Sequence, residues 1–139
     1  MVSSGTTVDT SPTLQYYTYD TGYFTATAST VYTITHNLDI AFGDLQINFL
    51  FKVTDTTPNQ YDFGDIIRLN SAVYPLGSTG NTSYGVSAYT ISSQNENNEF
   101  KIYAQARVHY TEDPAQSANM TLSWPAGQLR ILVMGTKYV

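Results

Sequence analysis

The sequence predicts an all-β domain, an antiparallel β-sandwich of short strands. In residues 99–110, apolar side chains alternate with polar ones, so an extended strand would have one apolar and one polar side. Residues 45–53 alternate in the same way. Turn-forming residues separate roughly eight such segments, and no segment shows the periodicity of a helix.

Each strand is predicted from alternation or from β-branched content, with a turn signal at its ends. The predicted strands span residues 14–20, 23–28, 31–36, 45–53, 64–69, 84–92, 99–110, 120–124 and 128–138. The strands 84–92 and 99–110 are expected to pair as a hairpin. The predicted loops are 55–63, 70–82 and 111–119. The longest of them, 70–82, is a candidate functional loop because such long loops in compact domains tend to be functional.

The chain is long enough for one domain with its own core, at 139 residues. Residues 1–12 are rich in Ser, Thr and Gly and predict a flexible lead-in or the junction to a longer chain, followed by a domain at 13–139. Only 12% of the residues are charged and 12 are Tyr. Such a neutral, Tyr-rich surface suits contacts with polyhydroxylated ligands or with further copies of the chain.

Charge and composition argue against several classes of protein. The net charge is -5 and the six basic residues form no cluster, so no nucleic-acid partner is predicted. There is no Cys for disulfides, thiolate metal sites or nucleophilic catalysis. The apolar runs are too short to cross a bilayer, so no membrane insertion is predicted. The first 12 residues lack the features of a secretory signal.

Catalytic and metal-binding patterns are weak. His36 lies beside Asn37 and Asp39, but no Gly-x-Ser-x-Gly nucleophile turn accompanies it, so we expect it to hold a turn by a hydrogen bond. Two His residues cannot complete a zinc set, and the calcium-loop pattern is absent. The carboxylates that a glycosidase could pair lie in turns, where solvated charges are common: Glu96 with Glu99, and Glu112 with Asp113. We therefore predict neither an enzyme nor a cofactor.

Aromatic residues beside loops are the more informative set. Sugar rings stack their CH faces on aromatic rings, and their hydroxyls need amide or carboxylate partners. The alternative is that these rings pack the sheet faces. The predicted ligand contacts are Tyr61, Asp62, Tyr74, Asn81, Tyr84 and Trp124.

The polar side of residues 99–110 is either a solvated sheet face or a contact surface between copies. Its alternating positions place five side chains together, and we predict them as a subunit interface. They are Lys101, Tyr103, Gln105, Arg107 and His109.

Residues 31–38, Val-Tyr-Thr-Ile-Thr-His-Asn-Leu, resemble a segment of the C-terminal tip domains of bacteriophage tail fibres. The closing run 128–136 is similar to the last strand of such tips. The match departs from the family at Asp39, where Gly is common. The resemblance transfers no catalytic residue.

The resemblance implies an H-type-lectin-like sandwich that assembles as a homotrimer in a virion and adheres to a host cell-surface glycan. It also implies synthesis in the host cytoplasm without a signal peptide, with residues 1–12 joining a fibre shaft. The alternatives are a structural oligomerisation module without its own ligand and, third, a glycan-cleaving enzyme.

Overall fold

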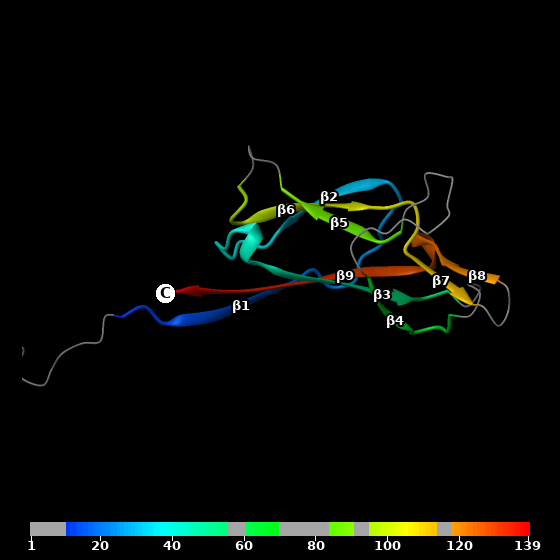
Figure 1. The fold of residues 1–139 in the computed structure, drawn as a ribbon, viewed down its shortest axis with the longest axis horizontal. Coiled ribbons are helices and arrows are strands. Elements are labelled where there is room, and N and C mark those ends of the chain that lie inside the picture. The colour runs from blue at the N-terminus through cyan, green and yellow to red at the C-terminus, as the bar shows by residue number, and fades with distance from the viewer. Residues whose placement is uncertain (1–10, 56–60, 70–83, 91–94, 114–117) are drawn as a thin grey trace, which may run out of the picture.

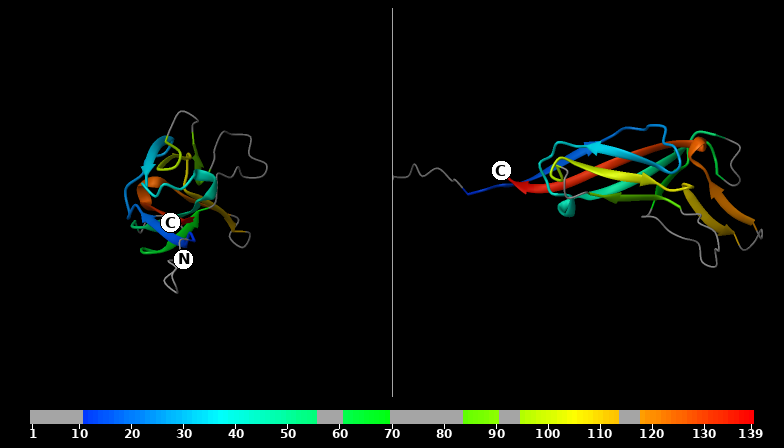
Figure 2. Two further views of the ribbon diagram at one scale, coloured as in Figure 1. Left: turned by 90° about the vertical axis from the view of Figure 1, so that its left-hand side faces the viewer. Right: turned by 90° about the horizontal axis from the view of Figure 1, so that it is seen from above.

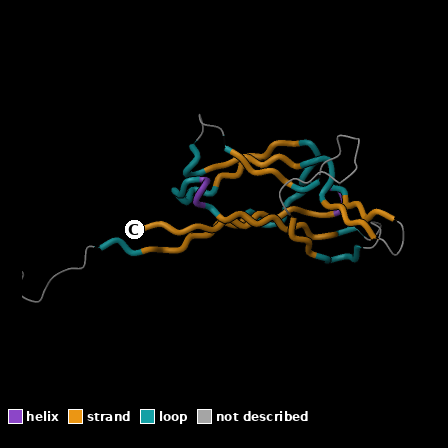
Figure 3. The backbone as a smooth tube through the Cα atoms, in the orientation of Figure 1, coloured by secondary structure: helices purple, strands orange, loops and turns teal. Residues whose placement is uncertain are grey.

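The computed structural model describes residues 11–55, 61–69, 84–90, 95–113 and 118–139, and it confirms the predicted all-β sandwich (Figure 1). The only helices in this part of the chain are two single 3-10 turns, drawn in purple in Figure 3. The elements are β1 Leu14–Asp20, β2 Thr30–Thr35, η1 Phe42–Asp44, β3 Gln46–Val53, β4 Ile66–Leu69, β5 Val86–Tyr89, β6 Glu99–Ala104, β7 His109–Asp113, β8 Ala118–Leu122, η2 Trp124–Ala126 and β9 Gly127–Tyr138.

Two antiparallel sheets form the layers of the sandwich. One sheet has four strands in the order β1-β9-β3-β4, and the other has three in the order β2-β6-β5. Strands β7 and β8 form a separate hairpin at the end of the body that lies away from the C-terminus (Figures 1 and 2). Sequence alternation singles out residues 99–110, but the longest of the described strands is β9, which pairs with both β1 and β3.

The core lies between the sheets, because alternate side chains of each strand face the other layer. From the four-stranded sheet come the odd-numbered residues of β3 and β9, such as Phe51, Leu129 and Ile131, and from β6 come Phe100 and Ile102. All five of these side chains are fully buried. The predicted inward face of residues 45–53 is thereby confirmed at its buried positions.

β1 and β9 run past the body of the sandwich as a two-stranded ribbon. The β3–β9 ladder ends at the pair Gln46–Met134, whereas the β1–β9 ladder continues to the pair Leu14–Tyr138. The ribbon and the C-terminus project together in Figures 1 and 2. This end of β9 therefore has β1 on one side and no β3 residue on the other.

Residues 99–110 do not form one strand, contrary to the prediction. β6 ends at Ala104, and β7 begins at His109 in a different pairing. Gln105, expected on the polar side, is buried instead. Its backbone carbonyl accepts a hydrogen bond of 2.7 Å from the indole N–H of Trp124. The strand is interrupted at this residue, where the backbone carbonyl bonds to a core side chain.

Two other predictions were wrong. Residues 23–28 make only one isolated bridge, from Phe24 to Leu129, and Ala28 is exposed rather than sharing a buried face with Ala26. The predicted loop 111–119 belongs largely to the β7–β8 hairpin, because Asp113 pairs with Ala118. Short polar strands lack the alternation that identified the others. The predicted hairpin of 84–92 with 99–110 is confirmed by the β5–β6 pairing.

The turn after β2 is built as the sequence predicts. His36 is buried, and its Nδ1 accepts a hydrogen bond of 3.0 Å from the backbone N–H of Leu38. Asn37 and Asp39 have φ values of 57° and 55°. Glycine adopts this left-handed region freely and Asn or Asp tolerates it, so the turn accommodates both side chains.

Candidate functional site

The outer side of the four-stranded sheet, here called the β9 face, carries the side chains that alternate with the core residues. The pairings place these even-numbered positions together. The β9 face consists of Leu14, Tyr16, Thr18 and Asp20 from β1, the even-numbered residues 128–138 of β9, Gln46, Asn48, Leu50 and Lys52 from β3, and Ile66 and Arg68 from β4.

A shallow, open pocket of about 300 Å³ lies on this face at the beginning of β3. Its walls are Tyr16 of β1, residues 43–46 and residues 134–136 of β9. It forms where β3 begins opposite Met134, two residues short of Thr136, so that η1 rather than a strand borders β9. Its volume is at the lower end of the about 300–1,000 Å³ of small-molecule sites.

The pocket combines one aromatic ring with three polar side chains. The Tyr16 hydroxyl donates a hydrogen bond of 2.8 Å to Met134 Sδ, and the residue is 63% exposed. Within the described part of the chain, the side chains of Asp44, Gln46 and Thr136 make no hydrogen bond, so their polar atoms are available to a ligand.

The backbone of β9 adds a further donor and acceptor beside the pocket. Val139 exchanges both backbone hydrogen bonds with Thr13, at 3.2 and 2.9 Å, so the odd-numbered residues of β9 point these groups toward β1. The even-numbered residues therefore point toward β3. Since β3 begins at Gln46, opposite Met134, no described strand pairs with the N–H and C=O of Thr136.

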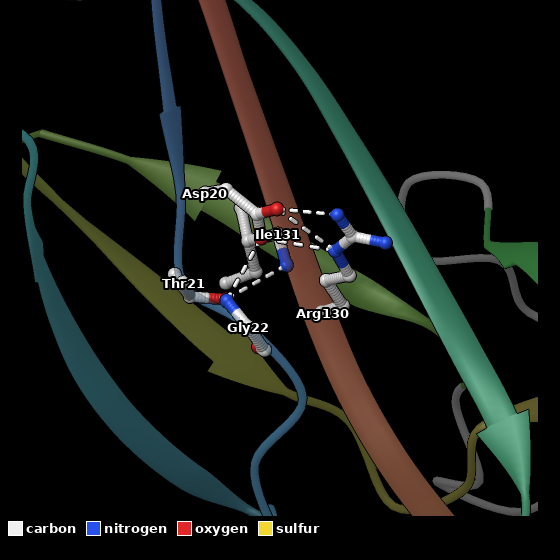
Figure 4. Close-up of polar contacts among 5 residues, drawn as sticks. All are labelled: Asp20, Thr21, Gly22, Arg130 and Ile131. Carbon is white, nitrogen blue, oxygen red and sulfur yellow. Dashed lines mark hydrogen bonds and ion pairs between the residues drawn. The ribbon is translucent and has the colours of Figure 1, made fainter.

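A charged cluster lies further along the same face (Figure 4). Asp20 forms an ion pair with Arg130, in which Arg130 Nε lies 2.9 Å from Asp20 Oδ1. The hydrogen bond from Arg130 lowers the pKa of Asp20 below its ordinary value, and Asp20 raises the pKa of Arg130. The guanidinium and the Lys52 ammonium lie 5.5 and 5.7 Å from the ring centre of Tyr23.

The turn beside this cluster is tied to β9 by its own hydrogen bonds. Gly22 N–H donates to Asp20 Oδ1 at 2.8 Å, and Ile131 N–H donates to Thr21 Oγ1 at 2.9 Å (Figure 4). The charges of Asp20 and Arg130 are thus engaged in the fold, unlike the polar groups of the pocket. We therefore take the pocket, and not the ion pair, as the candidate site.

The described residues contain no group of three or more His, Asp or Glu that could hold a metal ion. Of the carboxylates considered for glycoside cleavage, Glu96 is exposed in a turn and Glu99 pairs with Thr35 at the start of β6. The side chains of Glu112 and Asp113 lie outside the described part. Among the described residues, no helix has the length and apolar character needed to cross a bilayer.

The described residues among the predicted ligand contacts differ in their exposure. Trp124 is buried in the core, edge-on to Phe51 with ring centres 5.7 Å apart, so it cannot reach a ligand. Tyr61 is also buried in the core cluster. Asp62 is exposed, and Tyr84 is half-buried and bridges to Arg107. Tyr74 and Asn81 lie outside the described residues.

The predicted subunit interface is only partly preserved as a surface. Lys101 and Tyr103 share the outer side of β6, as predicted. Gln105 is buried and its Nε2 donates a hydrogen bond of 2.8 Å to Ser87 Oγ. Arg107 is exposed beyond the end of β6, and His109 begins β7 with its side chain outside the described part.

The pocket residues were missed because no local motif marks them. Alternation correctly predicts that Gln46 faces away from the core and that residues 14–20 and 128–138 are strands. The pairing of Tyr16 with Thr136 joins residues at opposite ends of the chain. Nothing in the sequence around either residue predicts that contact.

The comparisons with known proteins leave the site to be interpreted from its geometry. No protein-family model, no curated protein and no solved structure matches the chain.

Proposed function

We propose that this chain is a non-enzymatic adhesion domain that binds a cell-surface saccharide, as a receptor-binding domain at the tip of a phage tail fibre does. The observation that carries the proposal is the open pocket on the β9 face, where Asp44, Gln46 and Thr136 make no side-chain hydrogen bond within the described part of the chain. Adhesion needs such a shallow, accessible site, whereas acid–base catalysis needs groups held against the reacting atoms in a water-excluding cleft.

The surface chemistry supports the same proposal. The chain has few charges, 12 Tyr residues and a net charge of -5, which favours neutral hydroxylated partners over phosphates. The tail-fibre resemblance at residues 31–38 points in the same direction, and it carries with it the proposals of an H-type-lectin-like tip, a homotrimer and a place in the virion. In a trimer, three weak sites would act together through their effective concentration.

The test is competition for adsorption. Purified chain is mixed with candidate host cells, and its binding is measured with and without surface polysaccharide extracted from the same cells. A glycan array identifies the saccharide. We expect saturable binding that soluble polysaccharide inhibits, with no release of reducing sugar. Binding that survives removal of all surface glycan would contradict the proposal.

A second candidate is a structural oligomerisation module without its own ligand. The projecting β1–β9 ribbon favours it, because Leu14, Tyr138 and Val139 are each more than half exposed there. Two-stranded ribbons are marginally stable alone, so such a ribbon gains stability from a partner copy. A stable oligomer by light scattering, together with no glycan binding, would select this candidate.

A further inference from the structure

We propose that the pocket on the β9 face is the subsite for one neutral pyranose unit, stacked on Tyr16 and hydrogen-bonded to Asp44. This inference rests on the proposed adhesion function and goes beyond it by naming the site and the class of sugar. It places the ligand away from the loop residues that the sequence predicts.

Tyr16 supplies the stacking surface. It lies on the edge strand β1, and its hydroxyl donates a 2.8 Å hydrogen bond to Met134 Sδ, which restrains the ring while the residue stays 63% exposed. A restrained, exposed aromatic ring is what the CH face of a sugar packs against at low entropic cost.

Asp44, Gln46 and Thr136 supply the hydrogen bonds. A carboxylate accepts from two neighbouring hydroxyls, and Gln46 and Thr136 can both donate and accept. Asp44 is positioned by its own turn, since its N–H donates to Ala41 C=O at 2.9 Å. The backbone N–H and C=O of Thr136, left without a described strand partner, add one donor and one acceptor at the pocket wall.

Charge selects a neutral sugar. Asp44 is the only charged residue among those that line the pocket, and the chain as a whole has a net charge of -5. A carboxylated or sulfated sugar would bring a second negative charge next to Asp44 with no basic residue lining the site to offset it. A hexose or an N-acetylhexosamine avoids this repulsion.

The first experiment maps binding on the full wild-type chain. Backbone amide resonances of ¹⁵N-labelled protein are followed while D-glucose, D-galactose, D-mannose, N-acetylglucosamine or N-acetylneuraminic acid is added. We expect at least one neutral sugar to shift the amides of Gly43, Asp44, Gln46 and Thr136. The amides of Lys101 and Tyr103, on the opposite sheet, should not move.

The second experiment compares matched variants on the array and by the same titration. Asp44→Asn and Tyr16→Ala should each weaken binding by about tenfold or more. The first removes a charge-assisted acceptor, and the second removes the stacking ring. Asp65→Asn and Tyr103→Ala are the controls, since they make the same chemical changes at exposed or half-exposed positions away from the pocket. They should bind as the wild type does.

The outcomes separate the site from the function. Saccharide binding that is unchanged in Asp44→Asn and Tyr16→Ala, or that shifts amides elsewhere, would overturn the pocket and leave the adhesion function standing. Equal binding of N-acetylneuraminic acid at the pocket would overturn the neutral-sugar assignment. A wild-type chain that binds no free sugar, array glycan or host polysaccharide would overturn both. Circular dichroism confirms that each variant is folded.

Discussion

The outer faces of the two sheets are made of strands of the same kind, but their side chains are engaged differently. On the three-stranded sheet, the outer side carries Val31, Thr33 and Thr35 of β2, Ser87 and Tyr89 of β5, and Glu99, Lys101 and Tyr103 of β6. We call it the β6 face. Two of its polar side chains are bonded to each other, by the 3.0 Å hydrogen bond from Lys101 Nζ to Thr33 Oγ1.

The β9 face differs because its strands are unequal in length. β9 extends beyond the end of β3, and this difference creates the pocket and the ribbon. Large side chains such as Tyr16, Ile66 and Tyr138 are more than half exposed on this face. On the β6 face, β2 pairs with β6 along its whole length, so no comparable overhang forms between these two strands. In this molecule, the open pocket therefore lies where two neighbouring strands differ in length.

The largest effect is expected from a change at Trp124, and it tests whether this side chain belongs to the core between the two sheets or to one of the outer faces. Trp124→Ala should lower the free energy of unfolding by about 3–5 kcal/mol, because it leaves a cavity beside Phe51 and removes the hydrogen bond to Gln105. Urea denaturation followed by circular dichroism measures the loss, with Tyr103→Ala as the milder control. If Trp124→Ala kept the wild-type stability but lost saccharide binding, Trp124 would be a ligand contact and not a core residue.

Self-association distinguishes the two faces directly. Since Leu14 and Tyr138 pair on the exposed ribbon, we expect Leu14→Ser with Tyr138→Ser to dissociate the proposed trimer. Fully burying such a side chain contributes about 1.5–3 kcal/mol. Multi-angle light scattering over a range of protein concentrations measures the change. Tyr103→Ser serves as the control, and dissociation in that variant alone would establish the β6 face as the interface that the sequence predicts.

Acid should weaken the three-stranded side of the sandwich through His36, which follows β2. Burial lowers the pKa of His36 in the folded protein below 6.5, so the unfolded chain binds the proton more readily. The contribution of neutral His36 to the free energy of unfolding is therefore fully present above pH 6.5, and it is lost as the pH falls from 6.5 toward the pKa of the folded protein. Protonation of Nδ1 also removes the bond from Leu38 N–H, worth about 0.5–1.5 kcal/mol.

His36→Asn is the matched variant for this effect. An Asn side chain can accept from the same N–H two residues later but does not titrate. Unfolding measured at about pH 7.5 and about pH 5 should show a loss in the wild type that the variant lacks. An equal loss in both proteins would assign the acid sensitivity to other groups.

The smallest effect is expected at the charged cluster of the β9 face. Arg130 lowers the pKa of Asp20 below 3.8, so the pair contributes stability above that pH and loses it as the pH falls through the folded pKa. The side chains of Arg130 and Asp20 are 34% and 41% exposed, and solvent screens such pairs. Asp20→Asn should thus change the denaturation midpoint least of the four changes at neutral pH. A shift comparable to that of Trp124→Ala would contradict the screening argument.

How much of the fold could be predicted depends on the strand. Alternation marked Phe49, Phe51 and Val53 as core because their spacing puts them on one side of any extended chain. It failed at Gln105, whose burial depends on Ser87 and Trp124, and at residues 111–119, whose pairing involves no alternating pattern. The candidate ligand residues near loops were chosen by residue type, and type alone did not distinguish buried Trp124 from exposed Tyr16.

The sequence by itself determined that the chain forms β layers, where most strands lie, and that His36 and Asn37 make a turn. These properties are local, since they follow from the period of two and from the backbone angles that each residue tolerates. Only the tertiary structure decided that Tyr16 lies opposite Thr136, that β3 begins short of it, and that Asp44 borders the gap. The physical reason is that strand pairing over such a separation is set by the packing of the whole core.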